Sequence, residues 1–240
     1  MARTILITGA GKRLGRAFAL SLARAGWNVA VHYHRSEKEA KETAAEIESL
    51  SRKAYLVQAD LNDTDAVSGI FPALAKQGAR IDALINSAAA FEKDTLATLT
   101  QESWREHMQV NLLAPLLLMR DFARHYKGAE GCIINITDGL QGWSMSPAFL
   151  SYALSKESLT HATRMLAREL APAIRINAIA PGATLEGKQD KEDTFAKLAG
   201  IIPLKRTGSI EEVARALHFL LESPSVTGQV LMLSGGMDCA

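Results

Sequence analysis

The sequence predicts an α/β fold built on a parallel β-sheet, and three observations support this. Short apolar runs rich in β-branched residues alternate with segments in which apolar residues recur at helical spacing. A glycine-rich turn separates the first run from the first helical segment, as in βαβ units. No linker, low-complexity tract or repeat of solenoid length interrupts the alternation, which therefore favours one domain over 1–240 rather than two small ones.

Seven strands are expected from the apolar runs. They span Thr4–Thr8, Asn28–His34, Ala54–Gln58, Ile81–Ser87, Cys132–Thr137, Ile174–Ala180 and Val230–Leu233. Helical spacing and capping residues predict helices over Leu14–Ala25, Ser36–Leu50, Asp63–Gln77, Gln101–Tyr126 with a break near Pro115, Ser151–Leu170 and Ser209–Glu222. Residues 184–207 are weakly patterned, and we expect a mobile substrate loop there.

Composition excludes several classes of protein. The 240 residues carry 27 Lys and Arg against 26 Asp and Glu, and 48% are hydrophobic, which argues against a disordered chain and a nucleic-acid surface. No apolar run is long enough for a membrane span. The two cysteines, Cys132 and Cys239, are too few for a disulfide scaffold, so free thiols and a cytoplasmic location are expected.

The turn after the first strand carries three glycines, Gly9, Gly11 and Gly15. Glycine permits a sharp turn and lets a pyrophosphate approach backbone amides at a helix N-terminus. An ordinary strand-to-helix loop is the alternative, but the position after a strand and before a helix favours a dinucleotide site. The residues expected to bind the cofactor here are Gly9, Lys12, Arg13, Leu14 and Gly15.

The end of the second strand indicates which dinucleotide binds. NAD sites place an acidic residue there for the ribose hydroxyls, whereas this chain has His34, Arg35 and Ser36. Arg35, with Ser36 and Arg13, would hold a 2′-phosphate through charge-assisted hydrogen bonds. A solvated basic turn is the alternative, and the residues favour NADP(H) over NAD(H).

Tyr152 and Lys156 are four residues apart at the start of a predicted helix and therefore share one face. A neighbouring ammonium group favours phenolate and would lower the tyrosine pKa, so the pair is suited to proton transfer. Because this spacing is common, two exposed helix residues are the alternative for the pair taken alone.

The rest of the chain decides between these alternatives. The glycine turn, Asp60, Asn86-Ser87-Ala88-Ala89, Asn111, the Tyr152/Lys156 pair and Pro181-Gly182 occur in an order and spacing that resemble the short-chain dehydrogenase/reductase family. The resemblance extends from Thr4 to Gly236. It implies a single-domain Rossmann fold, a doubly wound seven-stranded parallel sheet flanked by helices, a nicotinamide cofactor and a homotetramer.

The resemblance also implies roles for individual residues. Asp60 and Leu61 would contact adenine, and Asn111 would hold a water relay that ends at Lys156. The residues implied on the ribose and nicotinamide side are Asn86, Ser87, Ala88, Pro181 and Gly182.

Three departures from the common family pattern indicate a subgroup. Asp138 stands where the family usually has a serine, Arg13 replaces the second glycine of the turn, and Phe91 follows the Asn86 segment. Together with His32-Tyr33-His34-Arg35-Ser36, they resemble the pteridine reductase branch, including the bacterial dihydromonapterin reductases.

The chemistry of a pterin agrees with these departures. Phe91 would stack on one face of the flat ring, and Asp138 would accept hydrogen bonds or relay a proton with Tyr152. Trp143 is expected to line the pocket with Met145, with a subunit interface as its alternative. The other four histidines, His107, His125, His161 and His218, show no metal-ligand spacing with Asp, Glu or Cys, so no metal is expected.

These residues are consistent with three functions. The favoured one is an NADPH-dependent reductase of a pterin or dihydrofolate-like small molecule, with Tyr152, Lys156, Asp138 and Asn111 as catalytic residues. The second is an NADPH-dependent carbonyl reductase of the 3-oxoacyl type, which normally uses the serine that Asp138 displaces. The third is a non-catalytic NADP(H)-sensing protein, which would be expected to lose one of Tyr152, Lys156 and Asn111.

Overall fold

The computed structural model describes residues 2–139, 147–185 and 194–239, and its centre is a parallel sheet. The described part forms seven strands in the order β3-β2-β1-β4-β5-β6-β7. Their bounds are β1 Thr4–Ile7, β2 Asn28–Tyr33, β3 Ala54–Gln58, β4 Ala83–Asn86, β5 Gly131–Ile136, β6 Ile174–Pro181 and β7 Val230–Leu233. The predicted doubly wound sheet is confirmed, and its strand order reverses between β1 and β4.

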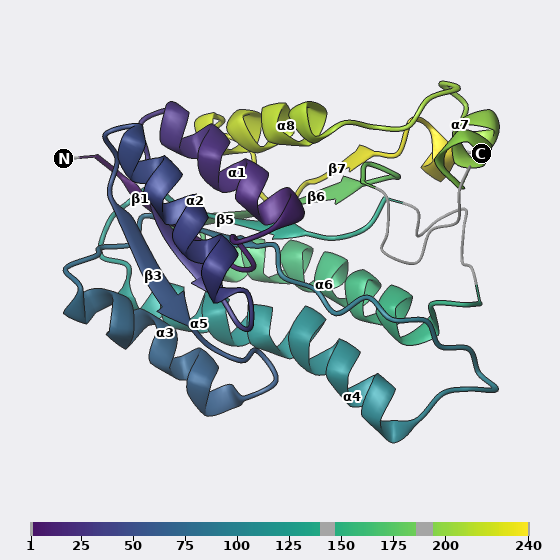
Figure 1. Ribbon diagram of the computed structural model, residues 1–240, viewed down its shortest axis with the longest axis horizontal. Coiled ribbons are helices and arrows are strands. Elements are labelled where there is room, and N and C mark those ends of the chain that lie inside the picture. The colour runs from purple at the N-terminus through teal and green to yellow at the C-terminus, as the bar shows by residue number, and fades with distance from the viewer. Residues whose placement is uncertain (1, 140–146, 186–193, 240) are drawn as a thin grey trace.

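Helices cover both faces of the sheet (Figure 1). On one face lie α1 (Arg13–Arg24), α2 (Glu37–Ser49) and α8 (Ile210–Glu222). On the other lie α3 (Thr64–Lys76), α4 (Gln101–Met108), α5 (Ala114–His125) and α6 (Leu150–Glu169). This layering places the carboxyl ends of all the strands at one edge, where the loops that carry the predicted site residues begin.

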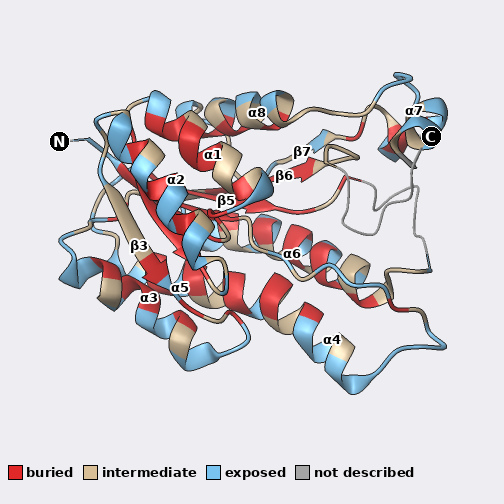
Figure 2. Cartoon of the chain, viewed as in Figure 1, coloured by how far each residue is buried: buried red, intermediate tan, exposed pale blue. Residues whose placement is uncertain are grey.

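Each face of the sheet has its own apolar core, and the inner strands between them are buried, whereas the edge strands β3 and β7 are only partly buried (Figure 2). Successive strand side chains point to opposite faces: Ile5 and Ile7 pack under α1 and α8, whereas Leu6 packs toward α3 and α5. Burial on both faces explains why the strands appear in the sequence as continuous apolar runs rather than alternating ones.

The long helix expected over residues 101–126 is broken earlier than predicted. A π-helical turn, Gln109–Leu113, separates α4 from α5, and Pro115 lies in the first turn of α5. Because proline has no N–H to donate to the carbonyl of residue 111, the regular hydrogen-bond ladder is interrupted at that carbonyl. The sequence indicated the interruption through Pro115, and the widened turn that results contains Asn111.

The region 184–207 differs from the loop that the sequence predicted. Residues 186–193 lie outside the described part of the chain, but α7 (Thr194–Ile201) follows them, and Leu204 donates its N–H to the Gly235 carbonyl at 3.2 Å. A short 3₁₀ helix, Met237–Cys239, was also not predicted. Most other boundaries differ from expectation by one or two residues, as fraying helix and strand ends commonly do.

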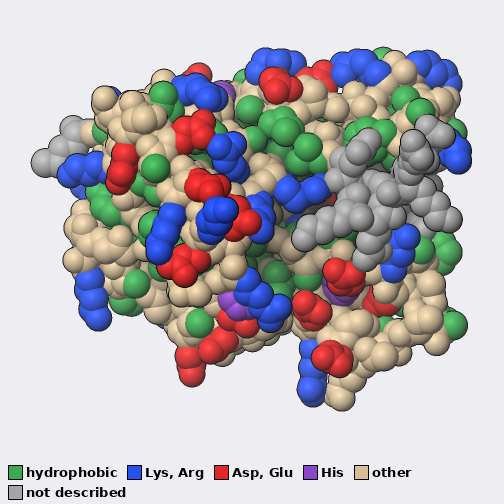
Figure 3. All heavy atoms as spheres, in the orientation of Figure 1, with side chains coloured by type: hydrophobic (Ala, Val, Ile, Leu, Met, Phe, Trp, Pro, Cys, Tyr) green, Lys and Arg blue, Asp and Glu red, His purple; other side chains and the backbone are tan. Residues whose placement is uncertain are grey.

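The surface agrees with the balanced composition. Acidic and basic side chains are interspersed on the face shown in Figure 3. None of the described helices is long and apolar enough to cross a membrane.

Candidate active site

The glycine turn packs too closely for larger residues. Gly9 has φ +68°, and a Cβ on Gly15 would lie 2.4 Å from the Gly9 carbonyl oxygen. The turn therefore brings the start of α1 directly against the end of β1, at the point where the strand order reverses. In open α/β sheets this crevice is where dinucleotides bind.

Arg13 occupies a strained position in this turn. Its φ is +51°, in the left-handed region that glycine adopts without cost and that other residues adopt at about 1–2 kcal/mol. The neighbouring Lys12 forms an ion pair with Glu39 of α2, with 2.6 Å between Nζ and Oε1. The departure from glycine thus places a cation in the turn at a conformational cost, a pattern that is typical of functional sites.

His32 is a residue of the site that the sequence reading left without a role. Its buried ring accepts the Gly9 N–H through Nδ1 at 3.2 Å and lies 3.2 Å from the Ala59 carbonyl through Nε2. Burial lowers the pKa of His32 to about 4, so the ring is neutral, with Nε2 donating to Ala59. His32 therefore links the ends of β1, β2 and β3. The sequence signal that could have pointed to this residue is the pair of histidines in His32-Tyr33-His34.

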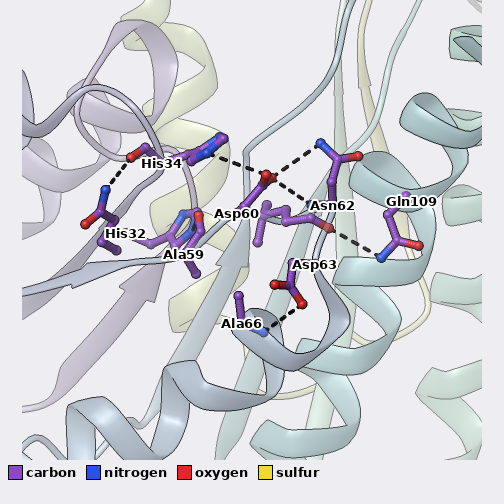
Figure 4. Close-up of polar contacts among 10 residues, drawn as sticks. His32, His34, Ala59, Asp60, Asn62, Asp63, Ala66 and Gln109 are labelled. Carbon is purple, nitrogen blue, oxygen red and sulfur yellow. Dashed lines mark hydrogen bonds and ion pairs between the residues drawn. The ribbon is translucent and has the colours of Figure 1, made fainter. Parts of the chain in front are cut away.

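The ends of β2 and β3, where the family resemblance implies adenine, lie side by side (Figure 4). His34 and Asp60 point toward one another, with 3.6 Å between Nε2 and Oδ2. Gln109 donates to the Leu61 carbonyl at 3.4 Å, which links this segment to the π-helical turn. Arg35 is exposed at the end of β2. Ser36 stands at the N-cap position of α2, as predicted, but its side chain makes no capping hydrogen bond.

The end of β4 is held by Thr8, a second residue that the sequence reading missed. The Thr8 hydroxyl accepts the N–H groups of Ser87 and Ala88, both at 2.9 Å. Asn86 donates to Asn135 at 2.8 Å, and its own Oδ1 is buried without a partner in the structure. These bonds fix Asn86, Ser87 and Ala88 beside the glycine turn.

Tyr152 and Asp138 are in direct contact. The Tyr152 hydroxyl donates to Asp138 Oδ2 at 2.9 Å, and Lys156 donates to the Ile136 carbonyl at 2.8 Å. Burial and the Asp138 charge raise the pKa of Tyr152 well above its ordinary value, while burial lowers that of Lys156 to about 8. The sequence predicted a lowered tyrosine pKa. The direction is the opposite, first because the phenol is buried and second because the Asp138 carboxylate contacts it directly, whereas the Lys156 ammonium is directed at a backbone carbonyl.

Asn111, in the π-helical turn, is hydrogen-bonded to two other segments of the candidate site. Its amide accepts from Ala90 N at 2.8 Å and donates to Ala90 O at 3.0 Å and to Ser155 Oγ at 3.0 Å. The widened π-helical turn thus joins the segment after β4 to the helix of Tyr152. The water relay that the family resemblance implies for Asn111 stays a prediction.

Phe91 lies beside Tyr152, and its predicted role in stacking on a substrate ring stays a prediction. Its ring stacks on Phe149 with centroids 4.7 Å apart and an interplanar angle of 7°, and it meets the Tyr152 ring edge-on at 4.7 Å. Half of Phe91 is exposed, so its ring is open to a ligand. Trp143 and Met145 lie outside the described residues, so their predicted contacts are not placed.

Pro181 and Gly182 border the same site. Pro181 ends β6 and its carbonyl accepts the Gly139 N–H at 2.8 Å, which anchors the chain directly after Asp138. A Cβ on Gly139 would lie 2.4 Å from the Ala180 carbonyl oxygen, so only glycine fits there. Among the described residues, no group of three or more His, Cys, Asp or Glu side chains is placed to hold a metal ion.

A parallel sheet with a glycine turn at its switch point and a tyrosine–lysine pair beside it defines a class, the dinucleotide-dependent oxidoreductases. Comparison with known proteins identifies the family within that class. The family model described as enoyl-(acyl carrier protein) reductase matches residues 9–238. The chain belongs to the short-chain dehydrogenase/reductase family, and the predicted fold and enzyme class are confirmed.

Three relatives show the range of the similarity. FolM alternative dihydrofolate reductase 1 from Brucella canis, solved with NADP, superposes with a TM-score of 0.93 at 36% identity over 99% of this chain and 94% of that one. The Brucella suis protein of the same name, also with NADP, gives a TM-score of 0.90 at 36% identity over 99% and 96%. A 3-oxoacyl-[acyl-carrier-protein] reductase, FabG of Staphylococcus aureus, is 29% identical over 99% of this chain and 98% of its own length.

Proposed function

We propose that this protein is an NADPH-dependent reductase of a pterin or dihydrofolate-like substrate. The observation that carries the proposal is the 2.9 Å hydrogen bond from the Tyr152 hydroxyl to Asp138, with the exposed Phe91 ring 4.7 Å from that of Tyr152. A carboxylate stands where carbonyl reductases of the family use a serine, next to an aromatic surface that fits a flat ring.

The residues at the strand ends fit NADP(H). In this proposal the pyrophosphate would meet Arg13 and the amides of the glycine turn that follow Ala10, since those of Gly9 and Ala10 bond to His32, and Asp60 and Leu61 would contact adenine. The end of β2 offers Arg35 and Ser36 to a 2′-phosphate, and no acidic side chain that would repel it follows the strand directly. The NADP complexes of the FolM relatives agree with this assignment. When bound, NADPH supplies the hydride.

The chain's own residues handle the proton. Tyr152 is protonated at neutral pH, so its hydroxyl is the group that donates a proton to a ring nitrogen when a C=N bond is reduced, although its raised pKa makes it a weaker acid than the sequence predicted. Asp138 holds the phenol through Oδ2 and accepts hydrogen bonds from the amino edge of a pterin. Lys156 is fixed by the Ile136 carbonyl and places a cation near the site.

The two catalytic side chains are rigidly supported. Lys156 is 2% exposed and Asn111 is fully buried. Asn111 bonds both to Ala90 and to Ser155, the residue directly before Lys156 in α6. This preorganisation disfavours a non-catalytic NADP(H)-sensing role, which would not require these residues to be kept together.

A carbonyl reductase of the 3-oxoacyl type is the second candidate. The FabG relatives, at 29% identity over nearly the whole chain, support it. Asp138 counts against it, because a carboxylate cannot replace the neutral hydroxyl that donates a hydrogen bond to a developing alkoxide.

We also propose a homotetramer in the cytoplasm. Large apolar side chains are exposed on two surfaces, one on helices and one on a helix and the edge strand, which supports burial against other subunits. They are Trp104, Leu113, Leu154 and Met165 on α4 to α6, and Phe219 and Met232 on α8 and β7. Both cysteines of the described chain are free thiols, which agrees with a reducing compartment.

Exchanging Asp138 for serine tests the proposal. Asp138→Ser should lower kcat for a dihydropterin by about 100-fold or more, the usual contribution of a proton-handling group, as measured by NADPH oxidation. Tyr152→Phe is the matched variant and should abolish reduction of any substrate. If Asp138→Ser reduced dihydropterins at the wild-type rate, the carboxylate would have no part in the chemistry and the pterin assignment would lose its basis.

A further inference from the structure

Asp94 is a buried carboxylate next to the site that the proposed reaction does not use. It is 2% exposed, and its Oδ1 accepts the Ser151 N–H at 2.9 Å. Its Oδ2 accepts the hydroxyl groups of Ser151 and Ser103, the latter at 3.2 Å. Burial alone would raise the pKa of Asp94, but these hydrogen bonds lower it further than burial raises it, so the carboxylate is ionised at neutral pH.

The carboxylate serves as the cap of α6. Phe149, at the N-cap position of that helix, makes no side-chain capping bond. Asp94 supplies the bond instead from 57 residues earlier in the chain, and a negative charge is favourable at a helix N-terminus. Its backbone adds two bonds, accepting from Leu150 N and donating to Ala148 O, each at 3.1 Å. The first turn of the helix that carries Tyr152 and Lys156 is therefore fixed by Asp94.

The segment that contains Asp94 also carries Phe91. Both backbone polar groups of Ala90 bond to Asn111, and Glu92 donates its N–H to His107 Nε2 at 3.2 Å. His107 in turn lies 2.8 Å from the Ser103 carbonyl through Nδ1. Phe91 is thus held on both sides, and Asp94 joins this anchored segment to α6.

We propose that Asp94 is a positioning residue that sets the distance between the Phe91 ring and the Tyr152 hydroxyl. The inference rests on the proposed catalytic role of Tyr152. One carboxylate bonds to α4 through Ser103 and to α6 through Ser151, and its own chain segment carries Phe91. Without this carboxylate, the Phe91 segment and the first turn of α6 keep only the Asp94 backbone bonds and the link through Asn111, and their relative position is less tightly set. A misplacement of about 1 Å at a reacting centre lowers the rate about 100-fold.

Two variants of Asp94 and one control test the proposal. Asp94→Ala removes the side-chain bonds to both helices, whereas Asp94→Asn keeps an acceptor for the Ser151 N–H and a polar group for the two hydroxyls. Asp63→Ala is the matched control, because Asp63 also caps a helix, accepting Asp65 N at 2.9 Å and Ala66 N at 3.2 Å at the start of α3 (Figure 4). Turnover is measured with whichever substrate class the wild-type enzyme reduces, and backbone hydrogen exchange is measured with NADP⁺ bound.

Asp94→Ala should lower kcat at least about 30-fold and raise the substrate KM, with the NADPH KM within about twofold of wild type. Asp94→Asn should recover kcat to within about threefold. Exchange of residues 151–155 should quicken in Asp94→Ala only, and that of 65–67 in Asp63→Ala only, with kcat of the latter unchanged.

Two results would overturn the positioning role. One is a wild-type kcat in Asp94→Ala, and the other is unchanged exchange of residues 151–155 in that variant. The exchange measurement needs no substrate, so a wild-type enzyme that failed to reduce pterins would refute the proposed function without deciding the role of Asp94.

Discussion

At the scale of single residues, the site is built from polar groups that strand ends bring together across large sequence distances. His32 bonds to the ends of β1 and β3, Thr8 bonds to the end of β4, and Asp94 bonds to α4 and α6. Each of these side chains is buried and hydrogen-bonded within the protein, so each fixes the backbone around the candidate site.

His32 should make stability fall in acid. Its pKa in the folded protein is about 4, below the ordinary value of 6.5, so the unfolded chain binds the proton more tightly. The contribution is complete above pH 6.5 and is lost as pH falls toward 4, by on the order of 3 kcal/mol. Urea unfolding across this range should show a shallower loss for His32→Gln, whose amide does not titrate. His161→Gln, on the exposed face of α6, should keep the wild-type profile. An equally steep loss in His32→Gln would assign it to other groups.

Arg35 should decide between the two nicotinamide cofactors. Removing one charge-assisted phosphate contact costs about 2 kcal/mol, so Arg35→Ala should raise the NADPH KM about 30-fold and leave the NADH KM nearly unchanged. Lys38→Ala is the control, because it removes an equal charge three residues further along the chain, in the first turn of α2, at a position 86% exposed to solvent. Steady-state kinetics with both cofactors measures this, and an equal rise for NADPH and NADH would contradict a 2′-phosphate contact.

At the scale of elements, Arg175 of β6 should hold the C-terminal end of α8. Its guanidinium donates to the carbonyls of Leu220 and Val226, both at 2.9 Å, and of Leu221 at 3.2 Å. Arg175→Met leaves these acceptors without their donor and should lower the free energy of unfolding by about 3 kcal/mol. Arg175→Lys should lie between the two, and Arg164→Met on the exposed face of α6 should change little. Chemical denaturation checks this, and a loss below about 1 kcal/mol for Arg175→Met would show that water replaces the bonds.

The elements also show what sequence patterns can and cannot predict. Strand positions, the parallel sheet and Ser209 as the cap of α8 follow from local patterns and were predicted, and the structure adds the capping box between Ser209 and Glu212. The π-helical turn at Gln109–Leu113 and α7 were not, because neither has a strong local signal. Asp94 was missed for a related reason: it caps a helix 57 residues away, and such a contact has no fixed spacing in sequence.

The candidate site was predictable to a similar extent. The glycine turn, Tyr152, Lys156 and Asp138 carry recognisable spacings, and the structure brings the last three to one edge of the sheet. The direction of the Tyr152 pKa was not predictable, because it depends on how deeply the phenol is buried and on which charged group contacts it. That contact depends on how the segment after β5 packs against α6, which the sequence pattern does not show.

At the scale of the whole molecule, a nearly neutral chain concentrates its chemistry at one edge of the sheet. The net charge of +1 does not reveal a cofactor site, because the cations expected to meet the cofactor are few and local. Arg13 lies in the glycine turn after β1, and Arg35 follows the neighbouring strand β2. A relative named as a dihydrofolate reductase and one named as a 3-oxoacyl reductase both match nearly the full chain, so family and fold agree with reduction of either a ring C=N bond or a carbonyl. Asp138 and its bond to Tyr152 favour the first.

The central claim is tested most directly by comparing substrates with the wild-type enzyme and NADPH. Dihydrobiopterin, dihydromonapterin and dihydrofolate would be measured against an acetoacetyl thioester by the loss of NADPH absorbance. We predict that kcat/KM for at least one of the pterin substrates exceeds that for the thioester by at least about tenfold, or about 1.4 kcal/mol in transition-state binding. Robust oxidation with the thioester and none with any pterin would contradict the account and establish a carbonyl reductase.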